Sequence, residues 1–171
     1  MTLDVFNRHA GKLHMANCAQ LINCLNSLYL AHEDRFVVTP VGHVFEMYAG
    51  HQGGASLRTS FSAPSGQYDR DGKPATSWGL NGSASLHGKD LLVTVVNPHT
   101  TQASKTEVAI RGDSANSAMA VTLSHADIHA RNTFDNRESV IPQKKACVVR
   151  NGIVVHTFSA ASVTALSIRL T

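Results

Sequence analysis

The sequence contains no long apolar run and no dense cluster of positive charge. No window comes near the roughly 18 uninterrupted apolar residues that a membrane-spanning helix needs, and Asp4, Arg8 and Lys12 interrupt the start of the chain. The 15 lysines and arginines are scattered, with Lys144 and Lys145 as the only adjacent pair. We therefore expect no membrane partner, no nucleic-acid partner and no signal peptide within this chain, and the sequence indicates no compartment.

Cysteine is scarce, and the cysteines have no metal-binding spacing. Cys18, Cys24 and Cys147 form no CxxC motif, and on a helix Cys18 and Cys24 would point in different directions, so we interpret all three as buried free thiols. His125 and His129 stand four apart, but no third ligand follows at a zinc-like spacing. The sequence therefore predicts no metal site and no cofactor.

Motifs for nucleophilic catalysis and for phosphate binding are also absent. There is no GxSxG elbow and no GxxxxGK loop. Hydrolysis of a glycoside needs two carboxyl groups that face each other, about 5 Å apart or more. Asp69 and Asp71 are close in sequence, but they stand in QYDRDGK, which is typical of a solvated turn. The residues alone indicate no catalytic site.

The first third of the chain has helical periodicity. Apolar residues recur at helical spacing over residues 15 to 30, which predicts an amphipathic helix. A short strand is expected over 36 to 38, and a second helix over 41 to 51. Gly53 and Gly54 follow as a hinge, and we place a domain boundary there, between residues 1–52 and residues 53–171.

Beyond this boundary the pattern favours β structure. Charged residues are only 16% and aromatic residues 6% of the sequence, a composition more typical of stacked sheets than of surface helices. The run VVRNGIVV predicts a hairpin with Asn151 and Gly152 in its turn. Residues 126 to 142 are expected to form a long ordered loop that crosses between the sheets. The predicted strands cover residues 56 to 62, 79 to 87, 90 to 97, 104 to 111, 117 to 124, 145 to 150, 153 to 159 and 162 to 170.

Three segments can be compared with known families: RHAGKLHMANCAQLINCLNSL at 8 to 28, VVTPVGHVFEMYAGHQ at 37 to 52, and NTFDNRESVIP at 132 to 142. In this order they resemble the C-terminal third of glycoside hydrolase family 51, the α-L-arabinofuranosidases. The resemblance implies a mainly β fold. It consists of a jelly-roll-like antiparallel C-terminal β-sandwich, preceded by two helices and a short strand that are the remnant of the end of a (β/α)8 barrel.

The resemblance also implies a function. Family members hydrolyse terminal non-reducing α-L-arabinofuranosyl residues in arabinan and arabinoxylan, with a glutamate acid/base and a glutamate nucleophile. The Asn-Glu and Asp-Glu-Trp motifs that carry these glutamates have no counterpart in this sequence. We therefore interpret the chain as the C-terminal part of such an enzyme and expect it to be inactive alone.

By the same resemblance, Gln20 matches the family glutamine that helps to hold the sugar, and the adjacent Asn17 is a second candidate for substrate binding. The alternative for Gln20 is a side-chain amide that bonds to the backbone. The implied partners are an arabinofuranosyl-containing glycan in the full-length enzyme, the rest of the barrel and further copies of the chain in a homo-oligomer. Without the barrel, apolar faces on residues 13 to 48 are expected to be exposed.

Two other functions compete with this interpretation. The sandwich could be a non-catalytic carbohydrate-binding module that uses Trp78 and Tyr68 as a platform for sugars. It could also be a structural module that completes an enzyme in trans or mediates subunit contacts.

Overall fold

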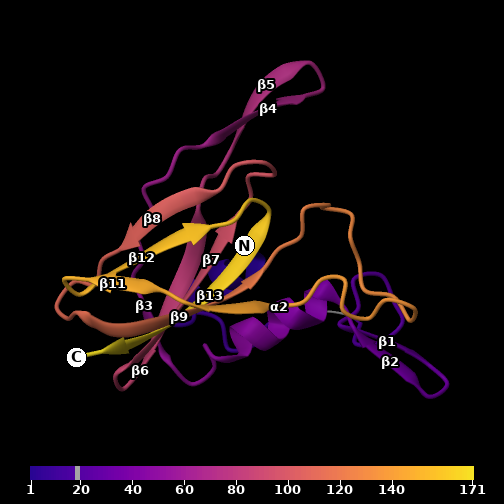
Figure 1. The fold of residues 1–171 in the computed structure, drawn as a ribbon, viewed down its shortest axis with the longest axis horizontal. Helices are drawn as coiled ribbons and strands as arrows, with labels where there is room; N and C mark the ends of the chain where they lie inside the picture. Colours follow the sequence, from indigo (N-terminus) through magenta and orange to yellow (C-terminus); the bar gives the residue numbers. More distant parts are fainter. Residues whose placement is uncertain (18–19) are drawn as a thin grey trace.

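The computed structural model describes residues 1–17 and 20–171, and its body consists of two packed antiparallel sheets with their connecting loops (Figure 1). The larger sheet has six strands in the order β10-β9-β13-β7-β6-β3, and the smaller has the order β11-β12-β8. The larger sheet comprises β3 Ala55–Leu57, β6 Asn81–His87, β7 Asp90–Asn97, β9 Ala115–Leu123, β10 Gln143–Ala146 and β13 Ser162–Leu170. The smaller comprises β8 Ser104–Val108, β11 Val148–Arg150 and β12 Ile153–Phe158.

The core lies between the two sheets and follows from alternation along the strands. On β13, Leu166, Ile168 and Leu170 are buried, while Ser167 and Arg169 on the opposite face are exposed. Val154 and Phe158 of β12 face the same core and are 0% and 1% exposed. The predicted β-sandwich is thereby confirmed.

Local turn chemistry fixes the hairpins as expected. Asn151 and Gly152 have φ of 50° and 75°, so both take the left-handed conformation that a tight hairpin turn requires. This turn places Arg150 opposite Ile153. The strand predicted over 145 to 150 is instead two strands, because the chain leaves β10 at Ala146 and enters β11 at Val148 in the other sheet.

Helix α2, Pro40–Ala49, precedes the sandwich and packs against β9 and β13 of the large sheet, and a strand pair lies beyond it (Figure 1). The helix begins after Thr39, whose Oγ1 accepts a hydrogen bond from the Gly42 N–H at 3.1 Å, and Pro40 occupies the first turn, where no N–H is needed. Its Met47 and Tyr48 pack with Leu123, Val140 and Ala165 in a second, smaller core. The strand pair is β1 Tyr29–His32 with β2 Arg35–Val38, and a short helix α1, Thr2–Arg8, begins the chain.

The amphipathic helix predicted over residues 15 to 30 is wrong for the described part of that segment. Residues 15–17 and 20–28 contain no helix, and the chain enters β1 at Tyr29. Asn23 and Asn26 have φ of 55° and 58°, which a right-handed helix cannot accommodate. The uncharged polar residues of this segment were the signal for a non-helical structure, because asparagine readily adopts a left-handed backbone.

A hairpin absent from the prediction projects from the sandwich. Strands β4, Gly66–Arg70, and β5, Lys73–Ser77, pair with each other, and Figure 1 shows them standing away from the body of the molecule. The turn was correctly located, because Asp71 and Gly72 have φ of 55° and 75° and the Asp69 carboxylate accepts from the Gly72 N–H. The strands were missed because their side chains are mostly exposed and lack apolar alternation.

Three smaller expectations can be compared with the structure. The predicted loop over residues 126 to 142 contains no helix or strand, but it joins β9 to β10 within the large sheet and does not cross between the sheets. Cys24 is exposed, so the interpretation as a buried thiol is wrong there, whereas Cys147 is partly buried and Cys18 lies outside the described residues. None of the helices in the described ranges is long and apolar enough to cross a membrane.

Candidate functional site

The two residues predicted to bind substrate, Asn17 and Gln20, lie in the irregular segment between α1 and β1. Both side chains are exposed, on either side of residues 18 and 19, which lie outside the described part of the chain. This arrangement leaves both amides accessible to a ligand or to another polypeptide.

Asparagine side chains hold this segment in place. Asn23 donates from Nδ2 to the Ala31 carbonyl at 2.7 Å and accepts from the Ala31 N–H at 2.8 Å, so one side chain imitates a strand partner for β1. Thr39 donates to the carbonyl groups of Ser27 and Leu28 at 2.8 and 3.1 Å. The described residues 23 to 28 therefore have a defined path that depends on side-chain hydrogen bonds and not on a helix.

Apolar side chains of the same segment point into solvent. Leu25 is 84% exposed and Met15 76%, far more than is usual for large apolar residues outside an interface. We call the exposed large apolar side chains of residues 13 to 36 the exposed apolar surface. They are Leu13, Met15, Leu21, Ile22, Leu25 and Phe36. The expectation of exposed apolar faces over residues 13 to 48 is confirmed for these residues but is wrong for Val37, Met47 and Tyr48, which are buried.

A buried polar network joins helix α1 to the large sheet. The Asp4 carboxylate is 0% exposed and accepts three hydrogen bonds: from Ser83 Oγ at 2.9 Å, Thr94 Oγ1 at 2.8 Å and Tyr48 OH at 2.7 Å. The amino group of Met1 lies 3.5 Å from Asp4 Oδ2. A buried carboxylate is costly unless several donors satisfy it, and here they come from β6, β7 and α2.

His51 extends this network just beyond α2. The Thr94 hydroxyl donates its hydrogen to Asp4, so the Thr94 oxygen accepts a hydrogen bond from Nε2–H of His51 at 3.0 Å. The other ring nitrogen of His51, Nδ1, then carries no hydrogen and accepts from the Ser85 hydroxyl at 2.7 Å. Burial lowers the pKa of His51, the charge of Asp4 opposes this shift, and the His87 charge adds to it. The pKa of Tyr48 is raised, first by burial and then by the Asp4 charge and hydrogen bond. Because these groups are buried and bonded to one another, we assign them to structure and not to catalysis.

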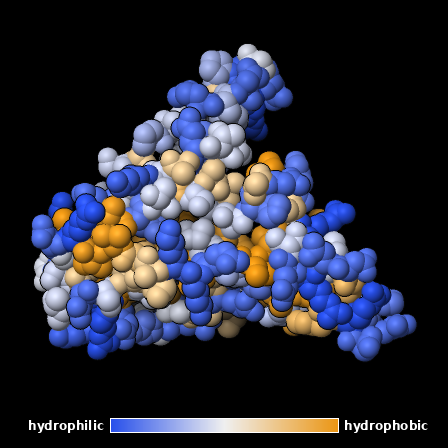
Figure 2. Space-filling view, viewed as in Figure 1, coloured by the Kyte–Doolittle hydropathy of each residue, from blue (hydrophilic) through white to orange (hydrophobic). Residues whose placement is uncertain are grey.

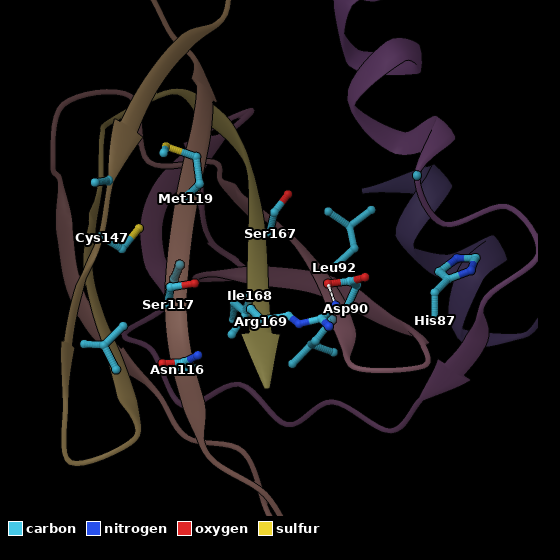
Figure 3. Close-up of a pocket in the computed structure, with 15 residues that line it drawn as sticks. His87, Asp90, Leu92, Asn116, Ser117, Met119, Cys147, Ser167, Ile168 and Arg169 are labelled. Atoms are coloured by element: carbon cyan, nitrogen blue, oxygen red, sulfur yellow. Dashed lines mark hydrogen bonds and ion pairs between the residues drawn. The ribbon is translucent and has the colours of Figure 1, made fainter. Parts of the chain in front are cut away.

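A first surface pocket, of about 860 Å³, lies on the outer face of the large sheet (Figure 3). Its floor is Met119, Ser167 and Leu92, which are paired in register on the adjacent strands β9, β13 and β7. Figure 3 also shows the ion pair at its edge, where Arg169 Nη1 lies 2.7 Å from Asp90 Oδ1. The charges of this pocket are thus already paired.

A second pocket, of about 450 Å³, lies where β10 diverges from the small sheet. Lys105, Lys145 and Arg150 line it together with His156 and Cys147. Between them the two pockets contain one carboxylate, Asp90, and neither offers the opposed carboxyl pair that glycoside hydrolysis needs. Within residues 1–17 and 20–171, no three His, Cys, Asp or Glu side chains gather as metal ligands.

Comparison with known sequences gives a consistent match. The sequence profile described as the alpha-L-arabinofuranosidase C-terminal domain matches residues 1–162. An intracellular exo-alpha-L-arabinofuranosidase of Bacteroides ovatus is 25% identical over 170 residues, which cover 99% of this chain and 33% of that protein. The chain spans about a third of the length of this curated relative.

Solved structures agree. The GH51 arabinofuranosidase of Xanthomonas axonopodis pv. citri superposes with a TM-score of 0.87 and 26% identity over 97% of this chain and 33% of that one. The thermostable GH51 enzyme of Thermotoga petrophila gives 0.81 and 26%, with 98% and 36% covered. The enzyme of Thermotoga maritima, at 24% identity and a TM-score of 0.83, supports the fold alone, with 98% of this chain and 36% of that one covered.

Proposed function

The chain belongs to the α-L-arabinofuranosidase C-terminal domain family, and we propose that it closes and supports the catalytic barrel of an α-L-arabinofuranosidase. The complete enzyme would release terminal non-reducing α-L-arabinofuranosyl residues from arabinan or arabinoxylan. In this proposal the sandwich is scaffold, residues 1–52 are the end of the barrel, and the acid/base and nucleophile are supplied by the rest of that barrel.

The exposed apolar surface is the observation that carries this proposal. Leu13, Met15 and Leu25 are 42%, 76% and 84% exposed, and Leu25 lies between Asn23, which is hydrogen-bonded to Ala31, and Ser27, which is hydrogen-bonded to Thr39. An ordered segment with this much apolar surface is expected to be covered in the functional protein. Since the chain matches a third of its relatives, the remaining two-thirds are the natural cover.

The proposed boundary at residue 52 separates a part that belongs to the barrel from a part that belongs to the sandwich, but it does not separate two units that fold independently. Asp4 of the barrel part accepts hydrogen bonds from Ser83 and Thr94 of the large sheet and from Tyr48 of its own part. The two parts therefore share buried polar contacts, and we expect them to unfold together.

Complementation tests the proposal. The chain is co-expressed with the first two-thirds of the Bacteroides ovatus relative, and hydrolysis of an aryl α-L-arabinofuranoside is measured for each part alone and for the mixture. We expect activity only in the mixture. Activity of this chain alone at enzyme-like rates would refute the proposal, and so would failure of two soluble parts to associate or to gain activity.

Gln20 is the proposed sugar contact, with Asn17 beside it. In the complemented enzyme, Gln20→Ala should raise KM or lower kcat/KM about tenfold or more, because a hydrogen bond to the sugar is lost. Gln67→Ala on the projecting hairpin is the matched control, since Gln67 is also exposed. Equal kinetics for the two variants would remove Gln20 from the site.

Carbohydrate binding by the sandwich is the second candidate, favoured by the exposure of Tyr68 at 48% and Trp78 at 66%. The strand register weakens this candidate. Tyr68 lies on the same face of the hairpin as Ala75 and Ser77, and Trp78 comes one residue after Ser77, so the alternation of a strand does not place the two aromatic rings on one face. Figure 2 shows the projecting hairpin as mostly hydrophilic. Titration with neutral arabino-oligosaccharides decides, since saturable binding that is lost in Trp78→Ala would favour this candidate.

A further inference from the structure

The second pocket combines a cavity with unpaired positive charge. It opens where the edge strand β10 of the large sheet separates from β11 and β12 of the small sheet. Lys145 comes from β10, Arg150 from β11 and Lys105 from β8, so three strands bring cations to one opening. Among the described residues, no aspartate or glutamate lines it.

These three cations have no ion-pair partner among the described residues. The ion pairs of residues 1–17 and 20–171 join Met1 to Asp4, His43 to Glu46 and Arg169 to Asp90. Each of those pairs lies outside the second pocket. Like charges that share one concave opening repel one another, and an anion that enters the opening relieves this repulsion.

The floor of the pocket adds no charge. Cys147 Sγ lies 3.6 Å from His156 Nδ1, which fits a weak hydrogen bond between a thiol and a neutral imidazole. Burial raises the pKa of Cys147, and burial followed by the charge of Lys145 lowers the pKa of His156. Both shifts favour the neutral forms, so this pair is not an activated nucleophile and the positive charge comes from the lysines and the arginine.

The remaining lining suits a small polar ligand. Thr122, Ser124 and Gln143 offer hydroxyl and amide groups beside the cations, and the volume of about 450 Å³ lies in the range of small-molecule sites. Hydroxyl and amide groups bind sugar hydroxyls, and lysine and arginine bind carboxylate or phosphate oxygens. The first pocket has no comparable positive charge free for an anion, because its Arg169 is already paired with Asp90.

From this placement we propose that the opening between β10 and the small sheet is an oxyanion-binding site for a carboxylated sugar or a free phosphate. None of residues 1–17 and 20–52 lines it, so the proposal does not depend on the proposed function. The ligand would be held outside the thiol–imidazole pair by Lys105, Lys145 and Arg150.

Calorimetric titration of the full chain at low salt tests this, with inorganic phosphate, D-galacturonate and neutral D-galactose as probes. We expect one saturable site for an anion and none for galactose. Tighter binding of galacturonate than of phosphate would identify a sugar acid as the ligand, and the reverse order would identify the free anion. No saturable binding of either anion would overturn the proposal.

Charge-removing variants locate the site. Lys145→Gln and Arg150→Gln should each weaken anion binding roughly fivefold, and the double variant roughly tenfold or more, because each removes one charge-assisted contact. Lys73→Gln on the projecting hairpin is the matched control and should leave affinity unchanged, since Lys73 does not line the pocket. Equal weakening by the control would reduce the effect to net charge and overturn the proposal. The exposed positions of all three cations make misfolding of these variants unexpected, and circular dichroism verifies this.

Discussion

Replacing Tyr48 by phenylalanine tests whether the region before the sandwich is anchored by the buried carboxylate. The Tyr48 hydroxyl donates to Asp4 Oδ2 at 2.7 Å, and Asp4 is 0% exposed. The other group near Oδ2 is the Met1 amino group at 3.5 Å. Tyr48→Phe keeps the ring in its apolar cluster and removes only this donor.

The expected cost follows from the charge of the acceptor. Hydrogen bonds to charged groups contribute about 1.5–3 kcal/mol, and the full amount is lost when the buried acceptor stays unsatisfied. For a chain of this size, such a loss lowers Tm by roughly 3 to 12 °C. Tyr68→Phe is the matched control, because Tyr68 is 48% exposed and should change the free energy of unfolding by less than about 0.5 kcal/mol.

Urea denaturation followed by far-ultraviolet circular dichroism measures both variants. A double-mutant cycle with Asp4→Asn isolates the contact, and we expect a coupling free energy of about 1 kcal/mol or more. Equal stability of Tyr48→Phe and Tyr68→Phe, or a coupling near zero, would refute the reasoning. Two separate unfolding transitions would show instead that residues 1–52 and the sandwich unfold independently.

Three further predictions concern stability. The pKa values of His51 and His156 in the folded state lie below their ordinary value of about 6.5, so on acidification the unfolded chain binds protons before the folded chain does. Tm should therefore stay constant from pH 8 down to about pH 6.5 and fall from there to pH 5. A rise of Tm on acidification would contradict this. Gly82→Ala would drive a Cβ into the Thr94 carbonyl oxygen of β7 and should cost at least about 3 kcal/mol. Gly11→Ala, where a Cβ would meet nothing within 4 Å, serves as the control in the same denaturation assay. Asn132→Ala removes one hydrogen bond to the Val38 carbonyl of β2 and two to the backbone of Val140 in the loop that joins β9 to β10, and should cost about 2–4 kcal/mol. A loss below about 0.5 kcal/mol would show that water replaces them.

Much of the sandwich could be predicted because its signals are local. Strand β7 was predicted over 90 to 97 and β13 over 162 to 170, with the bounds that the structure has. The turn at Asn151 and Gly152 depends on backbone preferences of those two residues alone. The motifs at 8 to 28 and 37 to 52 also indicated the family that the comparisons confirm.

The segment after α1 was mispredicted because the spacing of its apolar residues is that of an amphipathic helix, whereas the hydrogen bonds that it makes in the structure are not those of a helix. Asn23 finds its hydrogen bonds on Ala31, eight residues away, and the apolar side chains of Met15 and Leu25 remain exposed instead of forming a buried helical face. Periodicity reports which residues avoid water, but it does not say which surface covers them.

The sequence by itself determined the alternation of the strands, the turns and the family, because each depends on residues that are close together in the chain. Only the tertiary structure placed β13 between β7 and β9, brought Ser83 and Thr94 to Asp4, and gathered Lys105, Lys145 and Arg150 at one opening. The bonds of Ser83 and Thr94 to Asp4 join residues 79 and 90 positions apart. The local pattern of the strands fits many sheet pairings, and the burial of apolar side chains between the sheets selects among them.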